Sequence, residues 1–124
     1  MEYLIVFLGA GIGGALRHGV NVLVPRLAGT GFPYHTLIIN VTGSFVMGVL
    51  AEYFAFKGYL PQAWRLFLAT GILGGFTTFS AFSLEAVLLY ERGQFDMAAL
   101  YVAGSVVLSI AALFIGLAVV RSLT

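Results

Sequence analysis

Hydrophobic residues form four long runs along the chain, each about as long as a membrane-spanning helix. The runs cover 3–24, 34–56, 62–90 and 97–120. Short segments rich in proline, glycine or charge follow them, such as Pro25-Arg26 after the first run and Lys57-Gly58 after the second. A bilayer core about 30 Å thick needs about 20 mostly apolar residues per helix. The pattern therefore predicts an all-α membrane protein with four transmembrane helices in a single domain over 1–124.

The third run, 62–90, is too long for one straight crossing, since it would measure about 43 Å as a helix. Its middle, 74–80, combines a glycine pair suited to ending one helix with hydroxyls suited to capping the next. We therefore predict a third helix broken near the middle of the membrane. Backbone that is not helical at that depth must be buried in protein or line a watery cavity. A tilted helix with a glycine kink is the alternative.

A broken helix at this depth predicts an ion site. Carbonyl groups freed at the end of the first half suit a small hard cation, and amide groups freed at the start of the second half suit an anion. Asn40 on the second run, and Ser105 and Ser109 on the fourth, place polar side chains at membrane depth. Such groups need either a protein partner or a pore, and the sequence leaves both readings open.

Residues spaced as on one helix face give further candidates. Phe79 and Phe82 share a face after the predicted break, and Glu85 continues that line toward the membrane interface. The two rings suit either core packing or edge-on contact with an anion, because a phenyl ring has a positive edge. Glu85 suits either a place at the aqueous mouth or a role as a proton or ion handle.

Small residues mark the faces on which the predicted helices pack. In the first run Gly9, Gly13, Arg17 and Asn21 recur at intervals of four, which places them on one stripe. Glycine stripes of this kind let transmembrane helices approach closely. A stripe that contains an arginine is unsuited to facing lipid.

Composition supports a membrane location and excludes several functions. The chain is 60% apolar and 9% charged, with a mean hydropathy of +1.03, whereas soluble domains carry about 25% charged residues. A net charge of +1 makes nucleic acid an unsuitable partner. Cysteine is absent, and no arrangement of serine, histidine and acid is recognisable. We therefore predict that the chain is not an enzyme.

Positive charges are spread almost evenly over the two sides of the predicted membrane domain. The side with both termini carries Lys57, Arg65 and Arg121, and the other carries Arg26 and Arg92, with Arg17 toward it. Lysine and arginine normally collect on the cytoplasmic side. A chain without this bias is suited to inserting in both orientations, so that two inverted copies pair. A singly oriented protein with a weak signal is the alternative.

Three segments together resemble the Fluc (CrcB) family of fluoride ion channels. They are Gly-Gly-Ala-Leu-Arg at 13–17, Thr-Leu-Ile-Ile-Asn-Val-Thr-Gly-Ser-Phe at 36–45, and Gly-Gly-Phe-Thr-Thr-Phe-Ser-Ala-Phe-Ser at 74–83. The resemblance implies an antiparallel, dual-topology homodimer in the cell membrane, with two pores that export fluoride passively and reduce cytoplasmic fluoride. It also implies a structural Na⁺ on the dimer axis, held by the backbone carbonyls of Gly74 and Thr77 from each copy.

The same resemblance implies roles for individual side chains. Phe79, Phe82 and Asn40 match pore residues of the family, and Arg17 matches its vestibule arginine. The hydroxyls of Ser80, Ser105 and Ser109 match its polar track more loosely. Three positions depart from the family: Ala81 stands where threonine is frequent, His35 where glycine is usual, and His18 where an aromatic residue is usual.

Two rival functions fit a small four-span protein. A proton-coupled multidrug exporter of dual topology needs a carboxylate embedded early in the chain, but Glu2 is terminal, and Glu52 and Glu85 lie toward the ends of their runs. A membrane assembly subunit that transports nothing would use its glycine stripes only for packing. Flux of fluoride against chloride, with and without a proton gradient, distinguishes the three.

Overall fold

The computed structural model describes residues 1–56 and 61–123, and nearly all of them are helical. The helical elements in chain order are α1 (Glu2–Ala28), α2 (Tyr34–Phe56), α3 (Gln62–Arg65), η1 (Leu66–Leu73), α4 (Gly74–Phe76), α5 (Phe79–Glu91) and α6 (Phe95–Leu123). Four stretches are long and apolar enough to cross a membrane: Glu2–Ala28, Tyr34–Phe56, Gln62–Glu91 and Phe95–Leu123. The prediction of an all-α protein with four such helices is confirmed, and the chain is a multi-pass membrane protein.

The first and fourth helices are longer than the runs that predicted them. Helix α1 continues past the predicted end at Val24 and includes Pro25 in its last turns. It ends at Gly29, whose φ of 82° is left-handed and whose N–H donates to the Pro25 carbonyl. Lys57, one of the residues used to compare the two membrane sides, lies outside the described residues.

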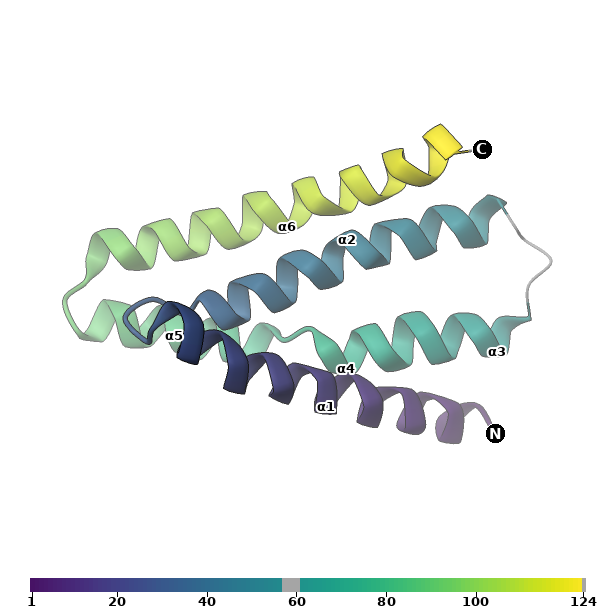
Figure 1. The fold of residues 1–124 in the computed structure, drawn as a ribbon, viewed down its shortest axis with the longest axis horizontal. Coiled ribbons are helices and arrows are strands. Elements are labelled where there is room, and N and C mark those ends of the chain that lie inside the picture. Colours follow the sequence, from purple (N-terminus) through teal and green to yellow (C-terminus); the bar gives the residue numbers. More distant parts are fainter. Residues whose placement is uncertain (57–60, 124) are drawn as a thin grey trace.

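The helices run side by side, and both termini lie at the same end of the molecule (Figure 1). Helix α2 packs mainly against α6, while α1 packs against η1 and α4. The connection from α1 to α2 and the turn from α5 to α6 lie at the other end. The third crossing is therefore the element placed between the α1 layer and the α2–α6 pair.

Glycines allow the close approach of α1 to the third crossing. A Cβ atom on Gly9 would lie 2.6 Å from the Phe67 carbonyl oxygen, and one on Gly13 would overlap the Ile72 carbonyl oxygen. Both glycines are buried. The glycine stripe predicted from the sequence thus packs α1 onto η1, as small-residue faces do in membranes.

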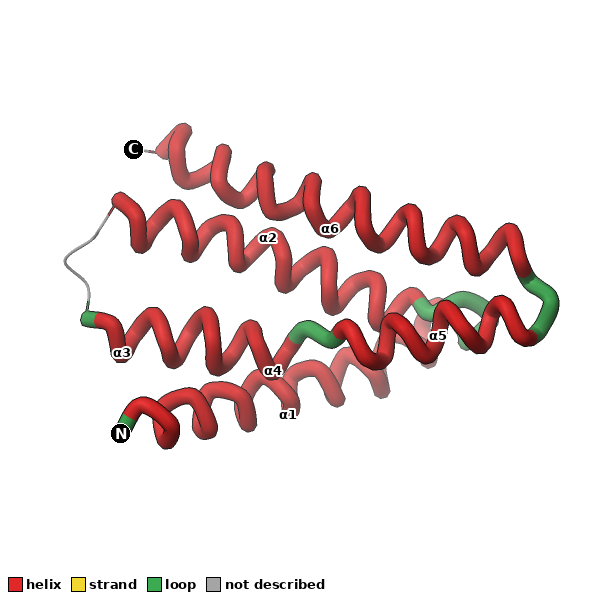
Figure 2. Tube along the Cα trace, turned by 180° about the vertical axis from the view of Figure 1, so that it is seen from behind, coloured by secondary structure: helices red, strands yellow, loops and turns green. Residues whose placement is uncertain are grey.

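The third crossing is interrupted between α4 and α5, as the tube in Figure 2 shows. Thr77 and Thr78 are extended, with φ and ψ of −80° and 159° and of −151° and 123°. Both lie within the stretch 74–80 in which the sequence placed the break. The segment before it, η1, is a π-helix, whose turns are wider than those of an α-helix. The sequence pattern did not predict this π-helix.

Candidate ion pathway

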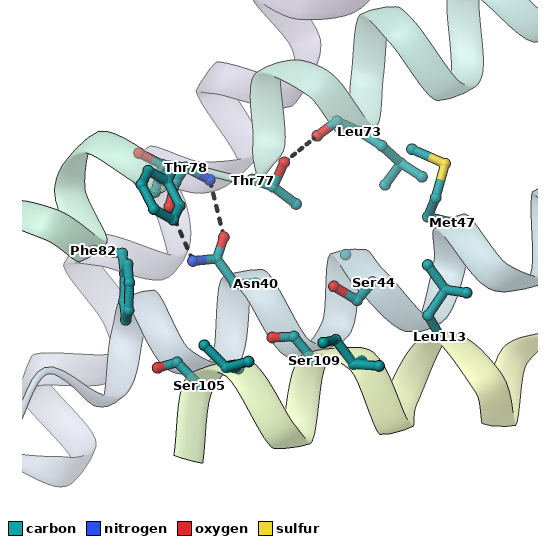
Figure 3. Close-up of a pocket in the computed structure, with 14 residues that line it drawn as sticks. Asn40, Ser44, Met47, Leu73, Thr77, Thr78, Phe82, Ser105, Ser109 and Leu113 are labelled. Atoms are coloured by element: carbon teal, nitrogen blue, oxygen red, sulfur yellow. Dashed lines mark hydrogen bonds between the residues drawn. The ribbon is translucent and has the colours of Figure 1, made fainter. Parts of the chain in front are cut away.

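A cavity of about 410 Å³ lies beside the interruption, between α2, α5 and α6 (Figure 3). None of the described residues that line it is charged. They are Asn40, Gly43, Ser44, Met47, Leu73, Thr77, Thr78, Phe79, Phe82, Ser105, Val106, Ser109, Ile110 and Leu113. The wall is thus mostly apolar, with a few amide and hydroxyl groups.

Asn40 holds the interrupted backbone in place. Its side-chain amide donates to the Thr78 carbonyl oxygen at 2.9 Å, and its side-chain oxygen accepts from the Thr78 N–H at 2.9 Å. Figure 3 shows both bonds. The side chain therefore pairs with extended backbone as a neighbouring strand would. Because buried backbone groups need partners, this pairing stabilises a break that lipid could not.

Thr78 also begins the second half of the crossing. Its hydroxyl accepts a hydrogen bond from the Ala81 N–H at 3.1 Å, which is the bond of a helix N-cap. The same hydroxyl lies 3.4 Å from the Ser80 hydroxyl. Helix α5 therefore starts at a defined residue, and the rings that follow it are fixed in register.

The backbone carbonyls of residues 74–77 lose their α-helical donors at the break, because α4 ends at Phe76 and α5 begins at Phe79. In a continuous α-helix the N–H of residue i bonds to the carbonyl of residue i−4, so Gly74 would accept from Thr78 and Thr77 from Ala81. Here the Thr78 N–H donates to Asn40 and the Ala81 N–H to the Thr78 hydroxyl. Gly74 and Thr77, to which the sequence resemblance assigned Na⁺, are two of the four residues whose carbonyls lose these donors. Oxygen ligands of this kind suit a hard cation.

Serine hydroxyls on α6 line the side of the cavity opposite the break. Ser105 is 6% exposed, and its hydroxyl has no hydrogen-bond partner among the described residues. Ser109 follows one turn later and also lines the cavity. A buried hydroxyl without a partner is unfavourable by about 1–3 kcal/mol. Ser105 therefore places a buried hydroxyl without a protein partner at the cavity wall.

The two phenylalanines lie together but differ in environment. Their ring centroids are 5.5 Å apart, and Phe82 also packs on the Tyr101 ring at 5.2 Å. Phe82 is 9% exposed, whereas Phe79 is 78% exposed. Both line the cavity, so one ring belongs to the interior of the protomer and the other lies at its surface.

The structure places four predicted site residues away from the cavity wall. Ser80 and Gly74 are exposed, and neither lines the cavity. Arg17 is partly buried on α1. Glu85 lies beside a second pocket of about 210 Å³ and contacts His35 and Tyr101. The cavity therefore brings together Asn40, Thr77, Phe79, Phe82, Ser105 and Ser109 from the predicted set.

Sequence reasoning did not assign Thr78 or Ser44 to the ion site. Thr78 belongs to the predicted run of capping hydroxyls, so its sequence signal was present but shared with its neighbours. Ser44 follows Asn40 by four residues, and that spacing places it on the same helix face. Only the fold shows that this face meets the break.

Comparison with known proteins agrees with this architecture. Residues 4–117 match the family model described as CrcB-like protein, Camphor Resistance (CrcB). The chain belongs to the CrcB family. It is 64% identical to a protein of Rhodopseudomonas palustris (strain BisB5) named "Fluoride-specific ion channel FluC", over 100% of both chains.

Other relatives carry the same name. A protein of Methylobacterium nodulans (strain LMG 21967 / CNCM I-2342 / ORS 2060) is 64% identical, over 98% of this chain and 97% of its own length, and is also named "Fluoride-specific ion channel FluC". "Fluoride-specific ion channel FluC 2" of Nitrobacter hamburgensis (strain DSM 10229 / NCIMB 13809 / X14) is 59% identical over 100% of both chains. The resemblance to the CrcB family that the sequence motifs indicated is thus confirmed.

Proposed function

We propose that this protein is a fluoride-specific ion channel that lets fluoride leave the cell passively through the cell membrane, and that it is not an enzyme. The names of full-length relatives support the choice of ion. The observation in the structure that carries the proposal is the uncharged cavity at the interrupted helix, whose wall includes the hydroxyl-bearing residues Ser105 and Ser109. Its function is to reduce the cytoplasmic concentration of fluoride.

The lining of the cavity suits a small anion that must exchange its water for other contacts. Hydroxyl groups on Ser105 and Ser109 donate hydrogen bonds, and the Phe82 ring offers a positive edge. Conduction also requires that the ion leave again. A fixed positive charge would hold it, and none of the lining residues within 1–56 and 61–123 carries one.

The functional unit that we propose is an antiparallel homodimer with two pores. The exposed Phe79 ring supports this, because a pore residue at the protomer surface needs a second protein to enclose it. The nearly even distribution of arginine over the two membrane sides supports insertion in both orientations. Ser80, Arg17 and Glu85 then lie along the approaches to the pores rather than at their centre.

The proposed dimer also gives a role to the carbonyl groups at the break. Gly74 and Thr77 of each copy would supply four oxygen ligands to one structural Na⁺ on the dimer axis. Such an ion would add positive potential near the anion path, where screening by solvent is weak. No group of three or more histidine, cysteine or acidic side chains suited to a metal occurs among the described residues.

Flux from liposomes that contain the purified protein tests the proposal. A channel should discharge fluoride and leave chloride behind, and a proton gradient should not drive fluoride against its own electrochemical gradient. A proton-coupled multidrug exporter would respond to the gradient, and an assembly subunit would pass neither anion. Fluoride retained as in protein-free liposomes would contradict the proposed function.

A further inference from the structure

A polar cluster joins three helices next to the cavity. Glu85 on α5 accepts a hydrogen bond from the Tyr101 hydroxyl on α6 at 2.9 Å. Its other carboxylate oxygen lies 2.8 Å from His35 Nε2 on α2. We call these three residues the His35 cluster. His35 is the second residue of α2, and the connection that precedes it lies at the end of the molecule away from the two termini (Figure 1).

The His35 cluster is connected to the cavity wall through Tyr101. The Tyr101 side chain is 1% exposed, and its ring packs on Phe82, which lines the cavity. Ser105, the unpartnered hydroxyl, follows Tyr101 by one helical turn. A change of charge or position at Glu85 therefore acts on the groups at one end of the cavity.

The charge of the cluster depends on His35. The side chains of His35 and Glu85 are only 26% and 19% exposed, so water screens the carboxylate incompletely. Arg92 lines the same pocket as both residues but is exposed and forms no ion pair with Glu85 among the described residues. Tyr101 contributes a neutral hydroxyl. Histidine is the side chain that normally changes charge between about pH 5 and 8, so it decides whether the carboxylate is balanced.

We propose that His35 is a positioning residue that makes fluoride passage depend on pH through Glu85. A protonated His35 holds the carboxylate and balances its charge, whereas a neutral His35 leaves a negative charge at the end of the path that repels the anion. Fluoride flux therefore falls several-fold as the pH rises through the range in which histidine loses its proton. This inference rests on the proposed function.

The test measures electrically driven fluoride efflux from liposomes at equal inside and outside pH, from about 6 to about 8.5. Protein-free liposomes give the leak of hydrogen fluoride, which is subtracted. His35→Gln retains an N–H donor toward Glu85 but cannot gain a proton, and it should remove the pH response. Glu85→Gln removes the charge and should also remove the response.

His18→Gln is the matched control, because His18 is the other histidine of the chain and lies exposed on α1. It should keep the wild-type pH response. Three results would overturn the role of His35 and leave the proposed function intact. They are a wild-type flux that does not vary with pH, a His35→Gln protein that responds as the wild type does, and a loss of response in His18→Gln. A wild type without fluoride flux at any pH would overturn the proposed function together with it.

Discussion

At the scale of single residues, Asn40 has the most sharply defined role. Its side-chain amide donates to the carbonyl of Thr78 and accepts from the N–H of the same residue. These two bonds replace helical bonds that Thr78 lacks at the break. A donor and an acceptor on one short side chain are required for this pairing. The same side chain lines the cavity, so one residue both supports the backbone and contributes to the cavity wall.

Asn40→Asp tests that coincidence. An aspartate carboxylate has no N–H to donate to the Thr78 carbonyl, so a carboxylate oxygen faces the carbonyl oxygen instead. The carboxylate also adds a negative charge beside the proposed path. We expect fluoride flux to fall at least about tenfold, which corresponds to about 1.4 kcal/mol. Asn21→Asp is the control, since Asn21 is exposed on α1 and lines no described pocket. Conduction retained in the Asn40 variant would place Asn40 outside the pathway.

Phe82→Ile tests the ring at the cavity wall. Isoleucine fills much of the same space but has no positive ring edge, and it loses contacts to Phe79 and Tyr101 worth about 0.5–1.5 kcal/mol each. We expect liposomes with the variant to retain fluoride while the protein still elutes at the wild-type size. Phe114→Ile, at a position 64% exposed on α6, should conduct normally. Equal flux from both variants would remove the Phe82 ring from the mechanism.

At the scale of elements, the third crossing depends on its neighbours. Its first half is π-helical over Leu66–Leu73 and lies against the glycine stripe of α1. Its second half begins at the Thr78 cap. Glycine backbones meet along this contact without side chains between them, so even one added methyl group must displace main chain.

Gly13→Ala should therefore destabilise the protein. A Cβ atom there would overlap the Ile72 carbonyl oxygen, and overpacking of this kind usually lowers the free energy of unfolding by about 1–3 kcal/mol. Gly11→Ala is the matched control, because nothing lies within 4 Å of a Cβ atom there and alanine favours helix by up to about 1 kcal/mol. Thermal unfolding in detergent should show opposite shifts. An unchanged midpoint for Gly13→Ala would contradict the observed packing.

At the scale of the whole molecule, the exposed surface is strongly apolar. Large hydrophobic side chains are exposed along all four membrane-crossing helices, for example Phe7 at 73%, Leu84 at 59% and Val107 at 64%. Lipid or a second copy covers such a surface in a membrane protein. The buried core is correspondingly small, and the cavity that we assign to the ion lies close to the protomer surface.

Thr30→Cys tests the proposed dual topology, because the chain has no cysteine of its own. Thr30 is exposed in the connection between α1 and α2. If the two orientations are equally populated, a maleimide that cannot cross the membrane should label about half of the protein in intact cells. After permeabilisation it should label all of it. Complete labelling, or none, in intact cells would show a single orientation.

Removal of sodium tests the proposed cation at the dimer axis. Dimers exchanged into solutions in which a large organic cation replaces sodium should lose thermal stability and fluoride flux, and addition of sodium should restore both. The reason is that a ligand bound only by the folded state stabilises that state. Stability and flux that stay the same without sodium would show that the Gly74 and Thr77 carbonyls need no cation.

The sequence by itself determined the helices and the place of the break. Length and hydropathy set the number of crossings, because a bilayer requires internally bonded apolar segments of fixed length. The excess length of 62–90 and its glycine and threonine residues placed the interruption within 74–80. Phe79, Phe82, Asn40, Ser105 and Ser109 were accessible through the resemblance and through their polarity or spacing at membrane depth.

Only the tertiary structure decided which of these groups meet. Asn40 and Thr78 are far apart in sequence, and their pairing depends on how α2 lies against the third crossing. The link from His35 through Glu85 to Tyr101 likewise joins three helices. Helical periodicity gives the face on which a residue lies but not the neighbour that the face contacts, since that depends on the relative shift and rotation of packed helices. The types of side chain at the cavity could therefore be read from the sequence, whereas their arrangement depends on how the helices pack.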